Sequence, residues 1–439
     1  MSVLNPEIEY AERSLIKSFQ EKRLVETLEY LSISSDYYKS VFRDYHIDVK
    51  SIQSLEDLKK IPVTTKDVLA KYNQSFVCVS QEKIIDYITT SGTVGDPVSL
   101  MMTDGDLERL AYNEAISFEV AGCSSSDIIQ LTTTIDKRFM AGMAYFLGAR
   151  KLGAGIIRVG AGMPELQWDS ILRFKPTVLI AVPSFILKLI EYAQKNDIDF
   201  RASAVKKVIC IGEPIRNVNF EFNTLGSKIT EAWPVELYST YASTEMATAF
   251  TECKHGAGGH HHPELIIVEF LDDQNNTVEH NMPGEVTITT LGVEGMPLLR
   301  YKTGDICYHY EEKCACGRST TRLGPVIGRK NQMIKYKGTT LFPSSIHEVL
   351  NSVAEIESYL IEVSTNEIGT DHILVKLSTK SSVNERFEKE LKDHFRAKLR
   401  VAPDIYIIDK MLLQSIQYPE SSRKPILFID KRTEAHNID

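Results

Sequence analysis

Residues 178–190 read VLIAVPSFILKLI, and residues 207–211 read KVICI. The first stretch begins with a short, continuous apolar run and goes on to a helical pattern over 185–190. The second stretch is another short apolar run. A buried strand, a helix and a further buried strand in succession are typical of an α/β protein with parallel strands.

The pattern extends along the chain in both directions. Similar apolar runs occur at 128–131 and 155–159, and residues 1–60 have the spacing of helices. Between 265 and 310 the character changes, because strand-like runs at 265–270 and 285–289 are separated by turn signals. This predicts an antiparallel β subdomain attached to a large α/β domain with parallel sheets.

The last 110 or so residues form a separate pattern. An amphipathic helix is expected over 384–399, with strand-like runs at 358–363, 372–377 and 404–408. A polar stretch at 328–331 is a fair domain boundary. We therefore predict an N-terminal domain over residues 1–327 and a small α+β domain over residues 328–439.

Composition excludes several classes of protein. The 439 residues include 50 Lys and Arg against 59 Asp and Glu, a formal charge of −9. A net negative surface does not attract nucleic acid or an anionic membrane. No secretory signal pattern and no apolar run of membrane-spanning length is found. Seven cysteines are too few for a disulfide scaffold, so we expect a cytoplasmic location.

The glycine-rich stretch at residues 89–97 reads TTSGTVGDP. Its glycines permit close approach of the backbone to a ligand, its hydroxyls can donate to phosphate oxygens, and successive N–H groups can form an anion nest. The same residue types also make ordinary surface turns. A Walker loop is excluded, since no G-x-x-x-x-G-K-[ST] pattern occurs.

This stretch resembles the phosphate loop T-S-G-T-T-G-x-P of the adenylate-forming superfamily of acyl-CoA synthetases. Further motifs follow in that family's order, and the G-x-E-P type segment is typical of phenylacetate-CoA ligases. The matching segments are Gly212-Glu213-Pro214, Tyr241-Ala242-Ser243-Thr244-Glu245, Tyr301-Lys302-Thr303-Gly304-Asp305, Gly328-Arg329 and Arg423-Lys424-Pro425.

The resemblance implies a reaction in which ATP converts a carboxylate into an acyl-AMP, with Mg²⁺ and aimed dipoles stabilising the polyanion. Thr244 would bind the α-phosphate, Glu245 would ligate Mg²⁺, and Asp305 would accept the ribose hydroxyls with Arg329 nearby. The other nucleotide-binding residues it implies are, for the phosphates, Thr90, Ser91, Gly92, Thr93 and Gly95, and, around the adenine, Gly212, Glu213, Pro214, Tyr241, Ala242 and Ser243.

The resemblance also implies a mobile C-terminal domain. Lys424 would neutralise charge during adenylation and then leave as this domain rotates, so that a CoA thiol reaches the acyl-AMP. Lys335 is a candidate for the CoA phosphates, and an exposed lysine on a turn is the alternative. The sequence departs from the family at Val98, Ala242, Asn331 and Arg423, where Lys, Gly, Asp and Gly are usual.

A cysteine and histidine pattern lies outside these motifs. Cys314 and Cys316 form a Cys-x-Cys pair, and Cys253 precedes a histidine-rich stretch. Three thiolates and one imidazole make a closed tetrahedral site of the kind that holds structural Zn²⁺. We favour His260 as the fourth ligand, with His261 and His262 as alternatives. Three free thiols beside a polar loop are the competing interpretation.

The substrate stays open at this stage. Candidates for the acid pocket are equally good core residues, namely Phe139, Met140, Ala141, Phe185 and Ile211. The favoured function is ATP-dependent activation of an aryl, phenylacetate-like acid followed by transfer to CoA. The alternatives are transfer to the phosphopantetheine of an acyl carrier protein, and nucleotide binding without turnover. A homodimer is an open possibility.

Overall fold

The structure is a computed structural model that describes residues 7–90, 98–280, 282–366, 370–383, 386–418 and 426–432. It divides into two compact units, Met1–Val326 and Ile327–Asp439. In the described ranges no helix is long and apolar enough to cross a membrane.

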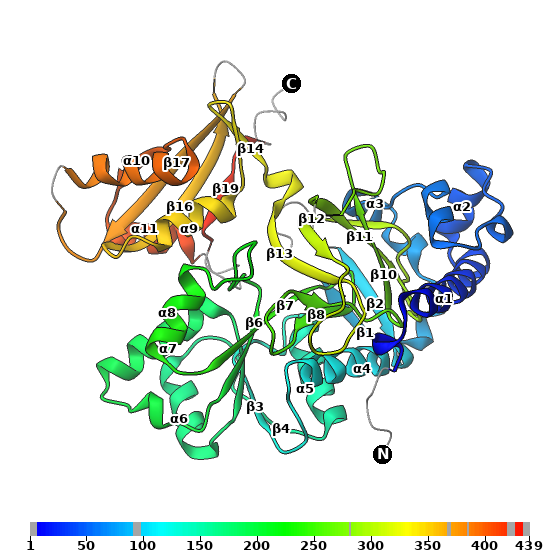
Figure 1. Ribbon diagram of the computed structural model, residues 1–439, viewed down its shortest axis with the longest axis horizontal. Helices are drawn as coiled ribbons and strands as arrows, with labels where there is room; N and C mark the ends of the chain where they lie inside the picture. Colours follow the sequence, from blue (N-terminus) through cyan, green and yellow to red (C-terminus); the bar gives the residue numbers. More distant parts are fainter. Residues whose placement is uncertain are drawn as a thin grey trace. The chain divides into compact units, whose positions relative to one another are not determined.

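A mixed sheet runs through the N-terminal unit (Figure 1), and eleven strands of the described chain form it in the order β10-β11-β12-β13-β9-β8-β7-β6-β5-β3-β4. Its bounds in chain order are β3 Ile128–Leu131, β4 Gly155–Arg158, β5 Val178–Ala181, β6 Lys207–Ile211, β7 Glu236–Ser243, β8 Thr248–Glu252, β9 Gly259–His260, β10 Ile266–Leu271, β11 Gly284–Thr290, β12 Tyr301–Tyr310 and β13 Arg322–Arg329.

The sheet changes direction part-way across. Strands β3 to β7 are paired in parallel, and the pairs β7–β8, β8–β9, β9–β13, β11–β12 and β10–β11 are antiparallel. All four residues of β5 are buried, as expected for a parallel strand with both faces covered. The predicted parallel strands and the antiparallel β10–β11 pair are therefore confirmed.

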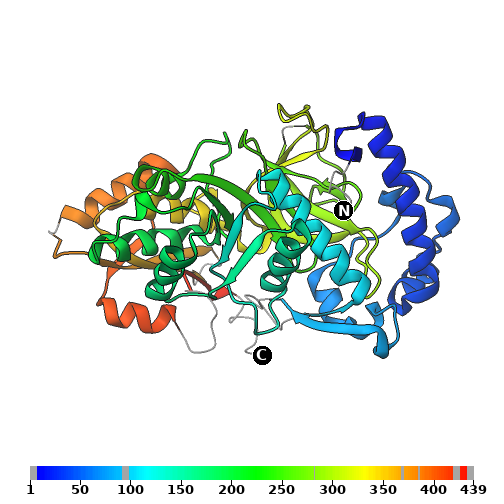
Figure 2. The ribbon, with the colours of Figure 1, turned by 90° about the horizontal axis from the view of Figure 1, so that it is seen from below.

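Helices cover both faces of the parallel strands, since alternate residues of β5 pack into two different cores that include helix residues. The N-terminal helices and those that follow the parallel strands lie at opposite ends of the N-terminal unit (Figure 2, blue and green). Their bounds are α1 Arg13–Ser34, α2 Asp36–Asp44, α3 Lys66–Lys71, α4 Asp104–Val120, α5 Met140–Leu152, α6 Pro164–Phe174, α7 Pro183–Lys195 and α8 Thr224–Ala232. Helix α7 buries one apolar stripe, which includes Ile186, Leu189 and Ile190, against the sheet.

Two paired strands flank the glycine-rich stretch in the sequence. Strand β1 (Ile84–Thr89) pairs antiparallel with β2 (Ser99–Thr103), and residues 91–97 between them lie outside the described residues. The described residues Thr90 and Val98 contact each other, because the Val98 N–H donates to Thr90 Oγ1 at 3.1 Å. Val98, where the family usually has lysine, is only 2% exposed and belongs to the core.

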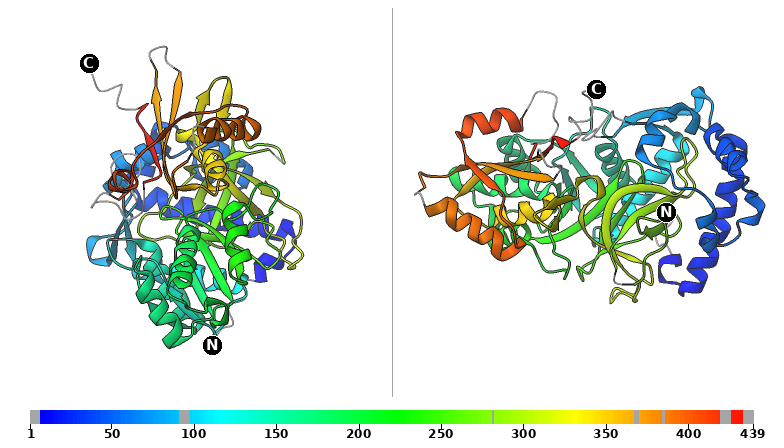
Figure 3. Two further views of the ribbon diagram at one scale, coloured as in Figure 1. Left: turned by 90° about the vertical axis from the view of Figure 1, so that its left-hand side faces the viewer. Right: turned by 90° about the horizontal axis from the view of Figure 1, so that it is seen from above.

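The C-terminal unit has its own core of aliphatic and aromatic residues. Its sheet has the order β18-β17-β16-β19, and the β16–β17 hairpin is the orange pair in Figure 3. Helices α9 and α10 pack against each other, and α11 packs on β16 and β17. The bounds are β14 Ile334–Tyr336, β15 Thr339–Leu341, α9 Pro343–Asn351, β16 Ile356–Thr365, β17 Asp371–Thr379, α10 Arg386–Leu399, β18 Asp404–Ile407, α11 Lys410–Gln417 and β19 Phe428–Asp430.

Candidate active site

Thr244 and Glu245 lie on a tight turn that joins β7 to β8. The Ala247 N–H donates to the Thr244 carbonyl at 3.3 Å, and the Met246 N–H donates to Ser243 Oγ at 3.3 Å. Glu245 is half-buried and accepts a hydrogen bond from the Tyr301 hydroxyl at 3.4 Å. Burial and the Glu245 charge both raise the pKa of Tyr301, so this hydroxyl stays a donor at neutral pH.

Asp305 of β12 and Tyr241 of β7 contact each other, although β13, β9 and β8 separate their strands in the sheet order. The Tyr241 hydroxyl donates to Asp305 Oδ2 at 2.9 Å, and the Thr303 hydroxyl accepts from the Asp305 N–H. Burial, followed by the Asp305 charge, raises the pKa of Tyr241 well above its usual value. The Asp305 carboxylate is therefore oriented before any ligand arrives, a partnership that the sequence motifs did not indicate.

The Gly212-Glu213-Pro214 segment follows β6 directly. Gly212 has a φ of 75°, a conformation that favours glycine. The Glu213 carboxylate accepts from the Ser184 N–H and from the Ser184 hydroxyl, both at 2.9 Å. Helix α7 has Val182 at its N-cap, which offers no side-chain acceptor, so Glu213 caps this helix from another segment.

Because this cap is lost on truncation, we expect Glu213→Ala to lower the free energy of unfolding by about 1–2 kcal/mol. The measurement is urea unfolding, with Glu221→Ala as a control that removes an exposed glutamate of a nearby loop. Equal stability of the two variants would show that Glu213 does not cap α7.

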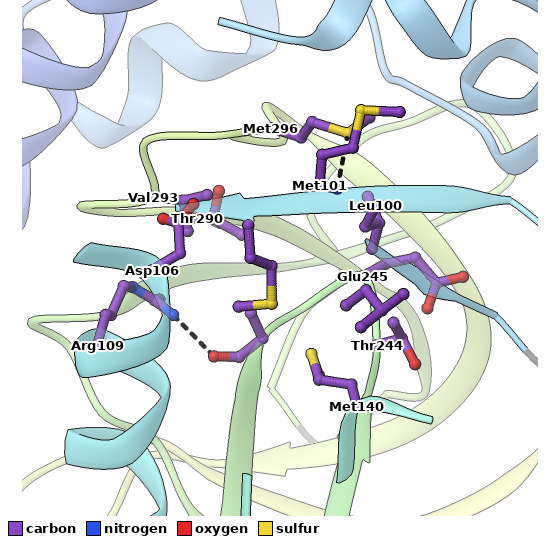
Figure 4. A pocket seen from close by; sticks show the side chains of 13 residues that line it. Leu100, Met101, Asp106, Arg109, Met140, Thr244, Glu245, Thr290, Val293 and Met296 are labelled. Carbon is purple, nitrogen blue, oxygen red and sulfur yellow. Dashed lines mark hydrogen bonds between the residues drawn. The ribbon is translucent and has the colours of Figure 1, made fainter. Parts of the chain in front are cut away.

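A pocket beside the turn contains Thr244 and Glu245 together with methionine side chains from other elements (Figure 4). Met140, at the start of α5, is the only one of the five predicted acid-pocket residues in its lining. Ile211 and Ala141 pack in the core around the parallel strands, and Phe185 packs on the core under α7. These three residues are therefore part of the hydrophobic cores and do not line this pocket.

Only some of the predicted site residues are both described and located in the N-terminal unit. Ala242 and Ser243 end β7 next to Thr244, and the Thr90 N–H donates to the Val98 carbonyl at 2.9 Å. Ser91, Gly92, Thr93, Gly95 and Lys424 lie outside the described residues. Arg329 and Lys335 belong to the C-terminal unit, where the Lys335 N–H donates to Asp371 at 2.7 Å and its side chain is exposed. Their roles at the nucleotide stay predictions.

The predicted cysteine and histidine residues come together. One ligand atom from each of Cys253, His260, Cys314 and Cys316 lies within 4.8 Å of the others. Cys253 Sγ and Cys314 Sγ are 3.7 Å apart, and Cys316 Sγ is 3.5 Å from His260 Nε2. A disulfide is excluded at the first distance, since bonded sulfurs are about 2.05 Å apart.

Electrostatics favour a positive charge among these sulfurs. Burial acts to lower the pKa of His260, but hydrogen bonds to the three cysteines raise it to about 10. Burial acts to raise the pKa of Cys316, but His260 lowers it to about 5. The other two candidate histidines are engaged elsewhere, His261 on the Ile266 carbonyl and His262 on Glu9.

Comparison with known proteins gives the family. Residues 25–295 match the family of AMP-binding enzymes, and residues 338–432 match the AMP-binding enzyme C-terminal domain. A phenylacetate-coenzyme A ligase from Thermus thermophilus is 28% identical over 88% of this chain and 85% of its own length. One from Escherichia coli is 25% identical over 92% and 93%.

Solved structures share the fold. A 2-hydroxyisobutyryl-CoA ligase in the postadenylation state superposes with a TM-score of 0.84 at 22% identity, covering 98% of this chain and 92% of that one. The chain belongs to the AMP-binding enzyme family, and within it to the phenylacetate-CoA ligase-like, adenylate-forming enzymes. It is an AMP-forming CoA ligase, which makes acyl-CoA in two steps, the first of which uses ATP. The predicted family, fold class and reaction are thus confirmed.

Proposed function

We propose that the acid is an aryl acid of the phenylacetate type and that the acceptor is the thiol of free CoA. The observation that carries the proposal is that four relatives, each a phenylacetate-coenzyme A ligase, are 24–28% identical over 83–95% of this chain.

In the first step a carboxylate oxygen attacks the α-phosphorus of ATP, a P–O bond forms, and pyrophosphate leaves. Thr244 donates to the α-phosphate, and Asp305, already oriented by Tyr241, accepts from the ribose hydroxyls. Mg²⁺ held by Glu245 would neutralise the phosphate oxygens. In the second step the CoA sulfur attacks the acyl carbon, AMP leaves, and the thiol proton is released.

The experiment is carboxylate-dependent exchange of pyrophosphate into ATP with a panel of acids. We expect phenylacetate-type acids to give a higher kcat/KM than benzoate, hydroxycinnamate, 2-hydroxyisobutyrate or a long-chain fatty acid. Adding free CoA or a holo acyl carrier protein to the best acid then identifies the acceptor. An aliphatic acid as the best substrate, or thioester formed only on the carrier protein, would contradict the proposal.

Lys424 is expected to act in adenylation and not in the transfer to CoA. We expect Lys424→Ala to slow pyrophosphate exchange roughly 100-fold, because a cation is then missing where charge develops at phosphorus. Conversion of supplied acyl-AMP and CoA into acyl-CoA should continue near the rate of the unmodified enzyme, which stopped-flow measurements test. Arg423→Ala is the matched control, since it removes the neighbouring charge. If the two variants exchanged pyrophosphate at equal rates, Lys424 would have no specific role in adenylation, and the prediction would be wrong.

We further propose that Cys253, His260, Cys314 and Cys316 hold a structural Zn²⁺. Tetrahedral bonds of about 2.3 Å to sulfur and about 2.0 Å to nitrogen place ligand atoms about 3.5–3.8 Å apart. The observed 3.7 Å between sulfurs and 3.5 Å between sulfur and nitrogen fit this requirement. His260 Nδ1 lies 3.3 Å from the Thr320 hydroxyl, which leaves Nε2 free to face the metal. Four protein ligands leave no open position, so the role is structural.

A further inference from the structure

Arg109 of α4 makes an unusual set of contacts beside the active-site turn. Its Nη1 donates to the Ala247 carbonyl at 2.7 Å, and its Nη2 donates to Thr248 Oγ1 at 3.2 Å. Nη2 also donates to the Leu265 carbonyl at 2.6 Å, and Nε donates to the Leu291 carbonyl at 2.8 Å. One guanidinium thus joins a helix to the turn before β8, the segment before β10 and the end of β11.

All four acceptors are neutral, which is costly for a cation out of water. Burial lowers the pKa of Arg109 to about 10, and the charges of Asp106 and Glu264, which act to raise it, offset this only in part. A leucine or methionine would fill the same space without that cost. The planar fork of arginine, in contrast, can reach several carbonyls at fixed angles at once. The fixed directions of its hydrogen bonds therefore explain an arginine at position 109 better than its charge does.

The backbone at Ala247 gives an independent reason. Its φ is 46°, in the left-handed region that a residue with a Cβ rarely adopts. Residues in such conformations persist only where their surroundings fix them, and they concentrate at functional sites. Here the carbonyl of the strained residue is the one that Arg109 Nη1 holds, and the turn that it ends contains Thr244 and Glu245.

We propose that Arg109 is a positioning residue for adenylation, which fixes the strained turn so that Glu245 and Thr244 face the nucleotide. Figure 4 shows Arg109 beside the pocket that these two side chains also line. Arg109 itself touches no reacting atom in this scheme. The inference rests on the proposed roles of Thr244 and Glu245, and the experiment below distinguishes its failure from theirs.

The test is Arg109→Met, assayed separately in the two half-reactions. We expect the rate of pyrophosphate exchange to fall on the order of 10- to 100-fold, because loosening a turn that carries catalytic groups misplaces them. The Mg²⁺ concentration for half-maximal exchange should rise with it. Acyl-CoA formation from supplied acyl-AMP, which uses no Mg²⁺ in the proposed scheme, should lose no more than about threefold. Equal losses in both half-reactions, with no change in Mg²⁺ dependence, would overturn the proposal.

Two further variants keep the result interpretable. Asn113→Ala is the matched control, because Asn113 lies one turn further along α4 and accepts from the Ala249 N–H of β8 at 3.0 Å. It should lower Tm without changing the ratio of the half-reactions. Arg109→Lys keeps the positive charge and is the variant to use if Arg109→Met does not fold. The single ammonium of lysine cannot make the four hydrogen bonds of the arginine fork. A normal exchange rate and Mg²⁺ dependence in the lysine variant would overturn the proposal.

The Glu245→Gln variant separates this inference from the proposed function. If Glu245→Gln is defective in exchange and Arg109→Met is normal, the role of Arg109 alone fails. If Glu245→Gln exchanges pyrophosphate at the normal rate, Glu245 is not the metal ligand. The proposed function of the turn, and therefore the proposed role of Arg109, then fails as well. Defects in both variants with the same shift in Mg²⁺ dependence are the expected result.

Discussion

We expect the substitution Glu245→Gln to lower the rate of acyl-adenylate formation about 10³-fold at physiological Mg²⁺. Glutamine has nearly the same shape, and its carbonyl oxygen can still accept from the Tyr301 hydroxyl, which now lies 3.4 Å from Glu245. The fold of the turn is therefore kept. What is lost is the negative charge that binds the metal on the phosphates. Pyrophosphate exchange over a series of Mg²⁺ concentrations measures the effect.

The control for this prediction removes a carboxylate charge nearby. Glu294 accepts from the Thr103 hydroxyl at 2.7 Å, and its side chain is exposed outside the pocket lining. Glu294→Gln should leave exchange unchanged within about twofold, since most surface substitutions have small effects. If the two variants were equally active, the charge of Glu245 would have no part in the reaction.

The strands could be predicted from the sequence because burial leaves a direct mark on composition. A parallel strand covered on both faces must be apolar throughout, so β5 and β6 were visible as continuous runs. The antiparallel pair β10–β11 was visible for a related reason, since turn residues separate its strands. Helix α10 begins at Arg386, two residues after its predicted start, where residues 384–385 lie outside the described chain.

The contacts that orient the site were harder to predict, because their acceptors carry no side-chain signature. Arg109 binds three backbone carbonyls, and any residue type offers a carbonyl. Glu213 caps a helix through Ser184, 29 positions earlier in the chain, so no local capping pattern marks it. The Tyr241–Asp305 bond joins two quoted motifs, but their strands β7 and β12 are separated by β13, β9 and β8 in the sheet, so neither the motifs nor the strand order indicates the contact.

The cysteine centre is an intermediate case. The Cys-x-Cys spacing indicated two ligands of one site, whereas the partnership with Cys253, 61 positions away, depends on how β8, β9 and the segment after β12 are arranged. The choice among three successive histidines could not be made from spacing. In the structure the strand pairing of β9 directs His260 toward the sulfurs, and its neighbours meet other partners.

We expect Cys314→Ser to lower the free energy of unfolding of the N-terminal unit by about 4 kcal/mol, because loss of a structural metal is among the largest single effects. The variant should unfold roughly 8 °C lower, and zinc per chain, measured by atomic emission, should fall from about one to well below it. The control is Cys123→Ser, since Cys123 is 5% exposed and Cys314 is 6% exposed. Its Tm should fall less, and its zinc content should not change.

The loss of stability in Cys314→Ser should extend to the N-terminal segment around Glu9, because Arg318 links this segment to the cysteine cluster. This side chain donates to Cys316 Sγ at 3.7 Å through Nη1 and to Glu9 Oε2 at 2.5 Å through Nε. Three thiolates on one Zn²⁺ leave a net negative charge, which the guanidinium offsets while it also holds the buried Glu9 carboxylate. Removing the metal should therefore increase hydrogen exchange at the Ser319 N–H, which donates to the Glu9 carbonyl at 2.8 Å. A wild-type enzyme without zinc, and a Cys314→Ser variant no less stable than Cys123→Ser, would contradict the metal assignment and leave the cluster as hydrogen-bonded thiols.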